Sequence, residues 1–137
     1  MTDMNANVIE EFRANDGVVG GWFKGMPMVL VHTTGAKSGI ERIIPLVYLP
    51  DADEPSRIYI FASKGGAPKS PDWYFNVLAN PDVTLEVGAD TYDATATELV
   101  GPQRDAVYAE QARRYSNFAD YEKATDRVIP VIALTRK

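Results

Sequence analysis

The sequence contains no cysteine and one histidine, and its apolar runs are short. The absence of cysteine excludes disulfides, thiolate metal sites and a cysteine nucleophile. Because His32 stands alone, a histidine-based metal cage and a Ser–His triad are not expected, and we predict no metal site. The apolar runs fall well short of the roughly 18 residues that a transmembrane helix needs. We therefore expect a protein without a transmembrane segment.

The chain also lacks an excess of basic residues, with 14 Lys and Arg against 19 Asp and Glu and a net charge of -5. Nucleic-acid binding depends on displacing counterions from phosphates, so this charge balance argues against it. The 137 residues, 45% hydrophobic and 24% charged, suit one globular domain spanning 1–137. The N-terminus has no basic and apolar signal-peptide regions, so a cytoplasmic location is expected.

Two segments combine glycine, lysine and serine directly after apolar runs. They are Gly35-Ala36-Lys37-Ser38-Gly39 and Ser63-Lys64-Gly65-Gly66-Ala67-Pro68-Lys69-Ser70. Glycine allows backbone N–H groups to approach a ligand, lysine adds a positive charge and serine adds a hydroxyl donor. This combination predicts a site for an anion such as a phosphate or a carboxylate. Taken alone, the first segment is equally well a tight turn with a solubilising lysine.

The surroundings of the second segment favour the anion site. No acidic residue occurs between Pro55 and Pro71, whereas Arg57, Lys64 and Lys69 are basic. Arg42, shortly after the first segment, could add a bidentate contact. Neither segment has the P-loop spacing or a GxGxxG before a helix, which leaves nucleotide or sugar-phosphate binding of another design.

The hydrophobic pattern predicts an α+β fold built on a mostly antiparallel six-stranded barrel. Pro45 lies inside the second predicted strand and cannot donate to a ladder, so we expect a bulge or an edge there. Ser70 and Pro71 are expected as the N-cap and first residue of a helix. The predicted helices are 4–15, 72–78 and 101–115, and the predicted strands are 28–34, 42–49, 57–62, 83–87, 91–99 and 128–135.

Several aromatic and polar residues outside these loops are further candidates. Trp73 is either a core anchor or a ligand-stacking residue, and Asn76, three positions on, could fix the edge of a heterocycle. Tyr115, Phe118 and Tyr121 form a stripe that is more typical of a core, although a tyrosine hydroxyl can also donate a proton. We interpret His32 as a packed, hydrogen-bonded residue.

A series of motifs in one order resembles the deazaflavin-dependent nitroreductase family of actinobacteria, split β-barrel oxidoreductases that use the deazaflavin coenzyme F420. The resemblance covers about Met28 to Leu134. Its motifs are Thr33-Thr34-Gly35-Ala36-Lys37-Ser38-Gly39, Arg42, Pro45-Leu46, Ala62-Ser63-Lys64-Gly65-Gly66-Ala67, Pro71-Asp72-Trp73-Tyr74-Phe75-Asn76, Ala79-Asn80-Pro81 and Thr125-Asp126-Arg127-Val128-Ile129-Pro130.

The resemblance implies a cofactor site in which basic residues hold the phosphate and glutamate tail, and the backbone of 44–47 lines the deazaflavin ring. The residues implied in cofactor binding are Ala36, Lys37, Ser38, Arg42, Ile43, Ile44, Pro45, Leu46, Val47, Phe61, Ala62, Ser63, Lys64, Asp72, Trp73, Tyr74, Phe75 and Asn76.

The resemblance also implies catalytic roles for Ser63, Tyr115 and Tyr121, and a position beside the substrate for Phe118. We also expect the aromatic ring of Trp22 to contact the substrate. At position 118 the family's nitroreductase has a tyrosine, and a phenyl ring cannot donate a hydrogen bond. We therefore expect F420H2-dependent hydride transfer to quinones, enones or other electrophiles, with weak or no reduction of nitroimidazoles.

Two alternatives are an FMN-dependent oxidoreductase and a non-catalytic protein of the same fold that holds a fatty acid or F420. Lys37, Arg42 and Lys64 around glycine turns argue against a lipid carrier. The expected partner is a small-molecule electron acceptor, and a homodimer and peripheral membrane contact stay open.

Overall fold

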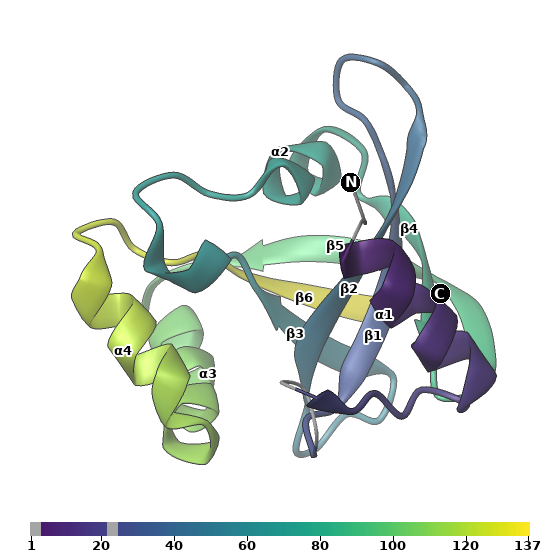
Figure 1. Cartoon of the computed structure of the whole chain (residues 1–137). Helices are drawn as coiled ribbons and strands as arrows, with labels where there is room; N and C mark the ends of the chain where they lie inside the picture. Colours follow the sequence, from purple (N-terminus) through teal and green to yellow (C-terminus); the bar gives the residue numbers. More distant parts are fainter. Residues whose placement is uncertain (1–3, 22–24) are drawn as a thin grey trace.

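Six strands close into an antiparallel barrel within residues 4–21 and 25–137, the part of the chain that the computed structural model describes (Figure 1). The strand order is β1-β2-β3-β6-β5-β4. The strands are β1 Met28–Thr34, β2 Glu41–Pro50, β3 Arg57–Phe61, β4 Asp82–Val87, β5 Asp90–Leu99 and β6 Val131–Arg136. The helices are α1 Met4–Ala14, the short 3-10 helix η2 Lys64–Gly66, α2 Asp72–Ala79, α3 Gly101–Arg114 and α4 Ser116–Ala124. The predicted α+β barrel is confirmed.

The alternation of side chains along the strands divides the core between the inside and the outside of the barrel. On β3, Ile58 and Ile60 join the interior cluster, while Tyr59 and Phe61 pack with residues of α3 and α4. Strand β6 does the same, so four successive residues from Val131 are buried. This explains why the pattern of β6 is continuously apolar rather than alternating.

The helices cover different parts of the barrel (Figure 1). Helix α1 places Phe12 in a cluster with Met28 and Leu30 of β1. Helices α3 and α4 pack as a pair beside the loop that contains η2, and α2 lies near the β1–β2 connection on another side. No described helix is both long and apolar enough to cross a membrane.

Three local predictions were wrong. The last strand begins at Val131 instead of Val128, because Val128 is exposed and Pro130 has no N–H to donate to a ladder. Helix α4 was not predicted, since its aromatic stripe follows the longer helix without a strong start signal. The N-cap of α2 is Pro71 rather than Ser70, whose hydroxyl accepts a hydrogen bond from Arg127 instead.

Strand β2 pairs with β1 over all but its last three residues, and with β3 only at those three. The register with β1 runs without a bulge from Glu41 to Val47, whereas the pairing with β3 is confined to Tyr48, Leu49 and Pro50. Tyr48 donates its N–H to Pro27, on the β1 side, so the alternation of the backbone turns position 45 toward the open side. Pro45 therefore lies on an edge, one of the two alternatives that the sequence left open.

A partly buried carboxylate ties α1 to the barrel. Glu86 of β4 receives two hydrogen bonds from Arg13, at 3.1 and 2.8 Å, and lies 2.6 Å from Nε2 of His32. Hydrogen bonds from Arg13, together with His32, hold the pKa of Glu86 below its usual value despite partial burial. His32 is thus a hydrogen-bonded residue, as predicted.

We predict that Glu86→Gln lowers the free energy of unfolding at pH 7 by about 1 kcal/mol, because it removes the charge-assisted hydrogen bonds with Arg13. The loss is no larger because Arg13 is half-exposed and solvent screens its charge. Since folding lowers the pKa of Glu86, its contribution is full above pH 4.5, the unfolded value, and is lost as pH falls through the folded value. Urea denaturation between pH 7 and pH 3 checks both effects. The exposed Glu10→Gln is the matched control, and an identical pH profile for Glu86→Gln and the unmodified protein would contradict the prediction.

Candidate functional site

Two adjoining cavities lie along the open edge of β2, between that strand, the loop after β3 and helix α2. Trp73 lines both. The apolar cavity, of about 200 Å³, is lined by Leu46, Val47, Phe61, Ser63, Lys64, Pro71, Trp73, Asn117, Phe118 and Tyr121. The cationic groove, of about 830 Å³, is lined by Thr33, Gly35, Ala36, Lys37, Ser38, Arg42, Ile44, Asp72, Trp73, Phe75 and Asn76.

The first glycine loop is held in a fixed shape by its own hydrogen bonds. Gly35 N–H donates to Ile40 O at 2.9 Å, and Gly39 N–H donates to Gly35 O at 3.0 Å. Gly39 has a φ of +71°, a conformation that favours glycine. Ser38 Oγ accepts a hydrogen bond from the N–H of Ile40 at 3.2 Å, so this hydroxyl oxygen stabilises the turn itself.

Asn76 of α2 and Asn80, the residue that follows α2, hold this loop and the end of β1 in place. Asn76 Oδ1 accepts the N–H of Ala36 at 3.0 Å, and Asn80 Nδ2 donates to Thr34 O at 3.3 Å. Asn76 therefore uses its carbonyl oxygen on the protein, and its amide N–H₂ is the part left for a ligand. The sequence predicted that Asn76 contacts a ligand but did not predict its hydrogen bond to the backbone of Ala36.

The cationic groove carries more positive than negative charge. Lys37, Arg42 and Lys64 are exposed and lie on the two cavities, and within residues 4–21 and 25–137 none of them has a carboxylate within 4.0 Å. Asp72 is the one carboxylate among the described lining residues. A local excess of cations in a protein of net charge -5 is the arrangement that attracts an anion.

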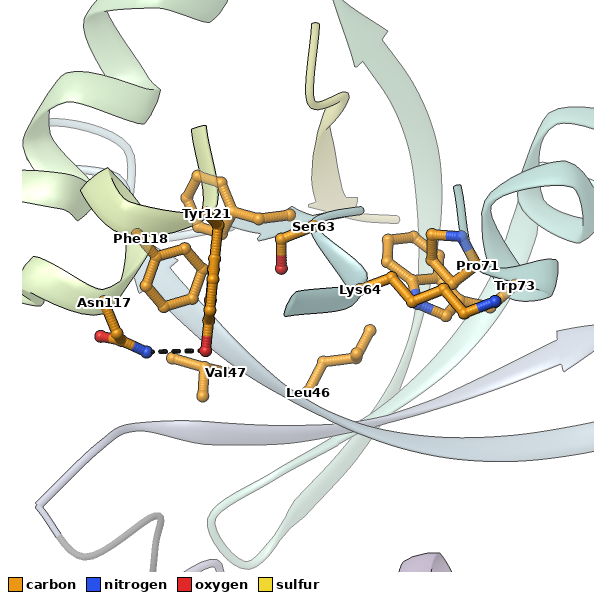
Figure 2. Close-up of a pocket in the computed structure, with 10 residues that line it drawn as sticks. Leu46, Val47, Ser63, Lys64, Pro71, Trp73, Asn117, Phe118 and Tyr121 are labelled. Atoms are coloured by element: carbon orange, nitrogen blue, oxygen red, sulfur yellow. Dashed lines mark hydrogen bonds between the residues drawn. The ribbon is translucent and has the colours of Figure 1, made fainter. Parts of the chain in front are cut away.

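The apolar cavity brings two hydroxyl groups together. In Figure 2 the hydroxyl of Ser63 points into the space between Tyr121 and Lys64. Asn117 Nδ2 donates to the Tyr121 hydroxyl oxygen at 3.0 Å. A phenol oxygen that accepts one hydrogen bond keeps its own hydrogen for another acceptor. Tyr121 can therefore donate to a group in the cavity.

Phe118 forms the aromatic floor beside these groups. It is 6% exposed, and its ring meets those of Phe61 and Tyr121 at centroid distances of 5.6 and 5.3 Å. The ring of Tyr115 lies 6.5 Å from that of Phe118, centroid to centroid, and Tyr115 does not line either cavity of the described chain. The stripe at 115, 118 and 121 is thus part core and part cavity wall.

Five of the predicted site residues lie away from both cavities of the described part. Ala62 is fully buried, Ile43 packs toward α1, and Pro45 is absent from the linings. Tyr74 turns from the groove and donates to Glu98 at 2.7 Å; burial and this contact raise its pKa to about 12. The fifth is Tyr115, and Trp22 falls outside the described residues.

The other predicted positions line the cavities, and the structure adds residues that the sequence did not single out. Asn117 was missed because no pattern distinguishes a helical asparagine one residue before an aromatic from a surface residue. Arg127 was quoted as part of a motif and given no role, although it contacts the second glycine loop. Among the basic residues of the anion-site argument, Arg57 instead contacts Thr135 and Asp51.

Known proteins with similar sequences and structures share this architecture. A family model described as F420H(2)-dependent quinone reductase matches residues 5–136. An F420H(2)-dependent quinone reductase of Mycobacterium tuberculosis is 40% identical over 133 residues, which is 92% of this chain and 85% of the relative. A solved F420-H2 dependent reductase (FDR-A) has 44% identity and a TM-score of 0.69, covering 79% of this chain and 93% of its own.

A second solved structure, described as a domain-swapped dimer, has 39% identity and a TM-score of 0.71 and covers 94% of this chain and 96% of its own. The six-stranded barrel is therefore the split β-barrel of these reductases. The family model spans nearly the whole chain, and the sequence identities to these relatives are high enough to show a shared family and not only a shared fold. This chain belongs to the F420H2-dependent quinone reductase family.

Proposed function

We propose that this chain reduces quinones with F420H2, with the deazaflavin ring in the apolar cavity and the phosphate and glutamate tail in the cationic groove. The observation that carries the proposal is the junction of these two spaces at Trp73. An apolar slot with two hydroxyls adjoins a groove whose cations have no carboxylate within 4.0 Å among the described residues, which matches a flat ring attached to an anionic chain.

The chemistry of the lining groups fits this cofactor. Leu46, Val47 and Phe61 offer apolar surface to a planar ring. Lys37 and Arg42 offer cationic donors to phosphate and carboxylate oxygens. A fatty-acid carrier needs one charged group at most, so the cations spread along the groove do not suit it. These features support F420 over the lipid alternative.

When bound, reduced F420 supplies a hydride, which carries two electrons and leaves one further proton to be delivered to a quinone. Tyr121, oriented by Asn117, would donate its hydrogen to the quinone oxygen as negative charge develops there. Ser63 offers a second donor at the same cavity. The aromatic rings of Phe61, Phe118 and Tyr121 offer flat surface against which an acceptor could be positioned.

Phe118, the aromatic floor of the cavity, also affects which electron acceptors can be reduced. Phe118 presents carbon and hydrogen to the cavity where a tyrosine would present a hydroxyl. Quinones and enones need one donor at a carbonyl oxygen, which Tyr121 can provide. A nitro group develops charge on two oxygens and would lack a donor at position 118. We therefore propose quinones and enones as the acceptor class, with weak reduction of nitroimidazoles.

A direct assay tests the proposed function. Purified protein should oxidise F420H2 when menadione is added, slowly oxidise it with cyclohexenone, and show little turnover with a nitroimidazole. NADH and reduced FMN serve as alternative donors in the same assay. Absence of turnover with F420H2, or bound FMN in the purified protein, would overturn the proposal.

The two exposed lysines on the cavities should strengthen cofactor binding. We predict that Lys37→Ala and Lys64→Ala each weaken F420 binding about fivefold, equivalent to about 1 kcal/mol, because each removes one solvent-screened charge contact. The loss should shrink at high salt. Titration against tryptophan fluorescence measures the affinity, since Trp73 lines both cavities.

Lys69→Ala is the matched control for these variants. Lys69 is an exposed lysine of the same glycine loop, but it lines neither cavity of the described chain. Its removal changes the net charge equally and should leave the affinity within twofold. Equal weakening by all three substitutions would indicate a general charge effect and contradict the assigned groove.

The hydroxyl of Tyr121 should act on turnover rather than on cofactor affinity. We predict that Tyr121→Phe lowers kcat with menadione about tenfold, the effect of losing one hydrogen bond in the transition state, while the Kd for F420 stays within twofold. Asn117→Ala should lower kcat less, because the hydroxyl remains but is no longer oriented. Steady-state kinetics with menadione measure both.

Two further tyrosines make the test specific. Tyr115 is the other tyrosine for which the sequence predicted a catalytic role. We expect a smaller effect from Tyr115→Phe because Tyr115 lines neither cavity of the described chain. Tyr92→Phe is the control, since Tyr92 lies under Arg136 and away from both cavities of the described chain. A larger loss in Tyr115→Phe than in Tyr121→Phe would contradict the assignment.

A further inference from the structure

The second glycine loop, residues 63–70, has a backbone conformation that requires support from elsewhere in the fold. Lys64 has a φ of +46°, in the left-handed region that residues with side chains seldom adopt, and Gly66 follows with a φ of +83°. The loop contains two internal backbone bonds, Gly66 N–H to Ser63 O and Ala67 N–H to Lys64 O. These two bonds close the 3-10 turn of η2 but do not attach it to the barrel.

Arg127 attaches the loop to the segment after α4. Its Nε donates to Ala67 O at 2.8 Å, its Nη2 donates to Ser63 O at 2.8 Å, and its Nη1 lies 3.3 Å from Ser70 Oγ. The three acceptors belong to the beginning, the middle and the end of the loop. A planar guanidinium holds them in one fixed geometry, which a lysine ammonium cannot reproduce.

A close packing contact adds to this attachment. A Cβ on Gly66 would lie 2.8 Å from Ala124 Cβ and 2.9 Å from Tyr121 O, so the loop rests directly on the C-terminal half of α4. The same helix places Phe118 and Tyr121 at the apolar cavity, while the loop places Ser63 and Lys64 there. The loop and the helix are therefore two walls of one cavity, joined behind it by Gly66 and Arg127.

The contacts of Arg127 also affect charge at the site. Its guanidinium binds two loop carbonyls, Ser63 O and Ala67 O, whose partial negative charge would otherwise oppose an anion near Lys64. Arg127 is half-buried and lines neither cavity within the described residues. We therefore expect Arg127 to act on a ligand through the loop that it holds and not by direct contact.

We propose that Arg127 is the positioning residue of the cofactor site: it holds Lys64 in its left-handed conformation and Ser63 at the cavity. This inference rests on the proposed function. Loss of the guanidinium releases the loop from its three anchors, so Lys64 and Ser63 spend less time in the binding geometry. The effect should fall on cofactor affinity, because Tyr121 and Asn117 belong to α4 and keep their own hydrogen bond.

Arg127→Gln and Arg127→Lys test the proposal. For Arg127→Gln we expect the Kd of F420 and the KM for F420H2 to rise about tenfold, and kcat at saturating F420H2 to fall less than threefold. Arg127→Lys keeps the charge but not the fork of donors, so it should raise the Kd about threefold. Arg113→Gln is the matched control, because Arg113 is an exposed residue of α3 paired with Glu110 and distant from the loop in sequence. The affinity of the Arg113→Gln variant for F420 should match that of the unmodified protein.

A double substitution separates positioning from general destabilisation. If Arg127 acts through Lys64, then Arg127→Gln should weaken F420 binding by less than threefold when Lys64 is already alanine. Full tenfold weakening in that background would overturn the proposal, as would an unchanged Kd in Arg127→Gln. If Arg127→Gln does not fold, Arg127→Lys alone carries the test, and its Kd must rise. Failure of the unmodified protein to bind F420 would instead overturn the proposed function.

Discussion

The separation of β2 from β3 is the constraint on which the site depends. Strand β2 is ten residues long, yet β3 pairs with only its last three, so its first part keeps one side open. Pro45 is compatible with that open side because its missing N–H costs no ladder bond there. The chain that leaves β3 then forms η2 and α2 next to the open edge, and both cavities arise between these segments.

Polar side chains hold the flexible parts of this arrangement in place. Asn76 fastens the first glycine loop to α2, Asn80 bonds the last residue of β1, and Arg127 fastens the second loop to the segment after α4. These residues bind backbone groups, which leaves the lysines of the loops without protein partners in the described chain. The site thus combines a hydrogen-bonded backbone with exposed cations, which suits a ligand with one flat end and one charged end.

Much of the fold could be predicted from the sequence, because the strands have strong apolar patterns and are separated by glycine, proline and aspartate turns. The strand Met28–Thr34 and the hairpin of β4 and β5 were predicted nearly to the residue. Helix α4 was missed because no strong start signal marks its beginning at Ser116, where no side chain caps the helix. The beginning of β6 was placed too early because Val128 and Ile129 are apolar, although Val128 is exposed.

The candidate site was predictable to the level of its loops but not to the level of each side chain. Lysine, serine and glycine together indicate an anion site whatever the fold, and the motif order indicates the family. Whether Tyr115 or Tyr121 reaches the cavity depends on how α3 and α4 pack, which the spacing of the aromatics leaves undetermined. The role of Arg127 could not be inferred either, since its three acceptors lie 57 to 64 positions away.

The measurement that most directly tests the account is a crystal structure of the protein with F420 bound. The account predicts the deazaflavin ring in the apolar cavity beside Leu46 and Ser63, and the phosphate and glutamate tail along Lys37 and Arg42. A ring bound elsewhere on the barrel, such as the pocket lined by Tyr74, Glu98 and Arg104, or a tail directed away from Lys37, would contradict it.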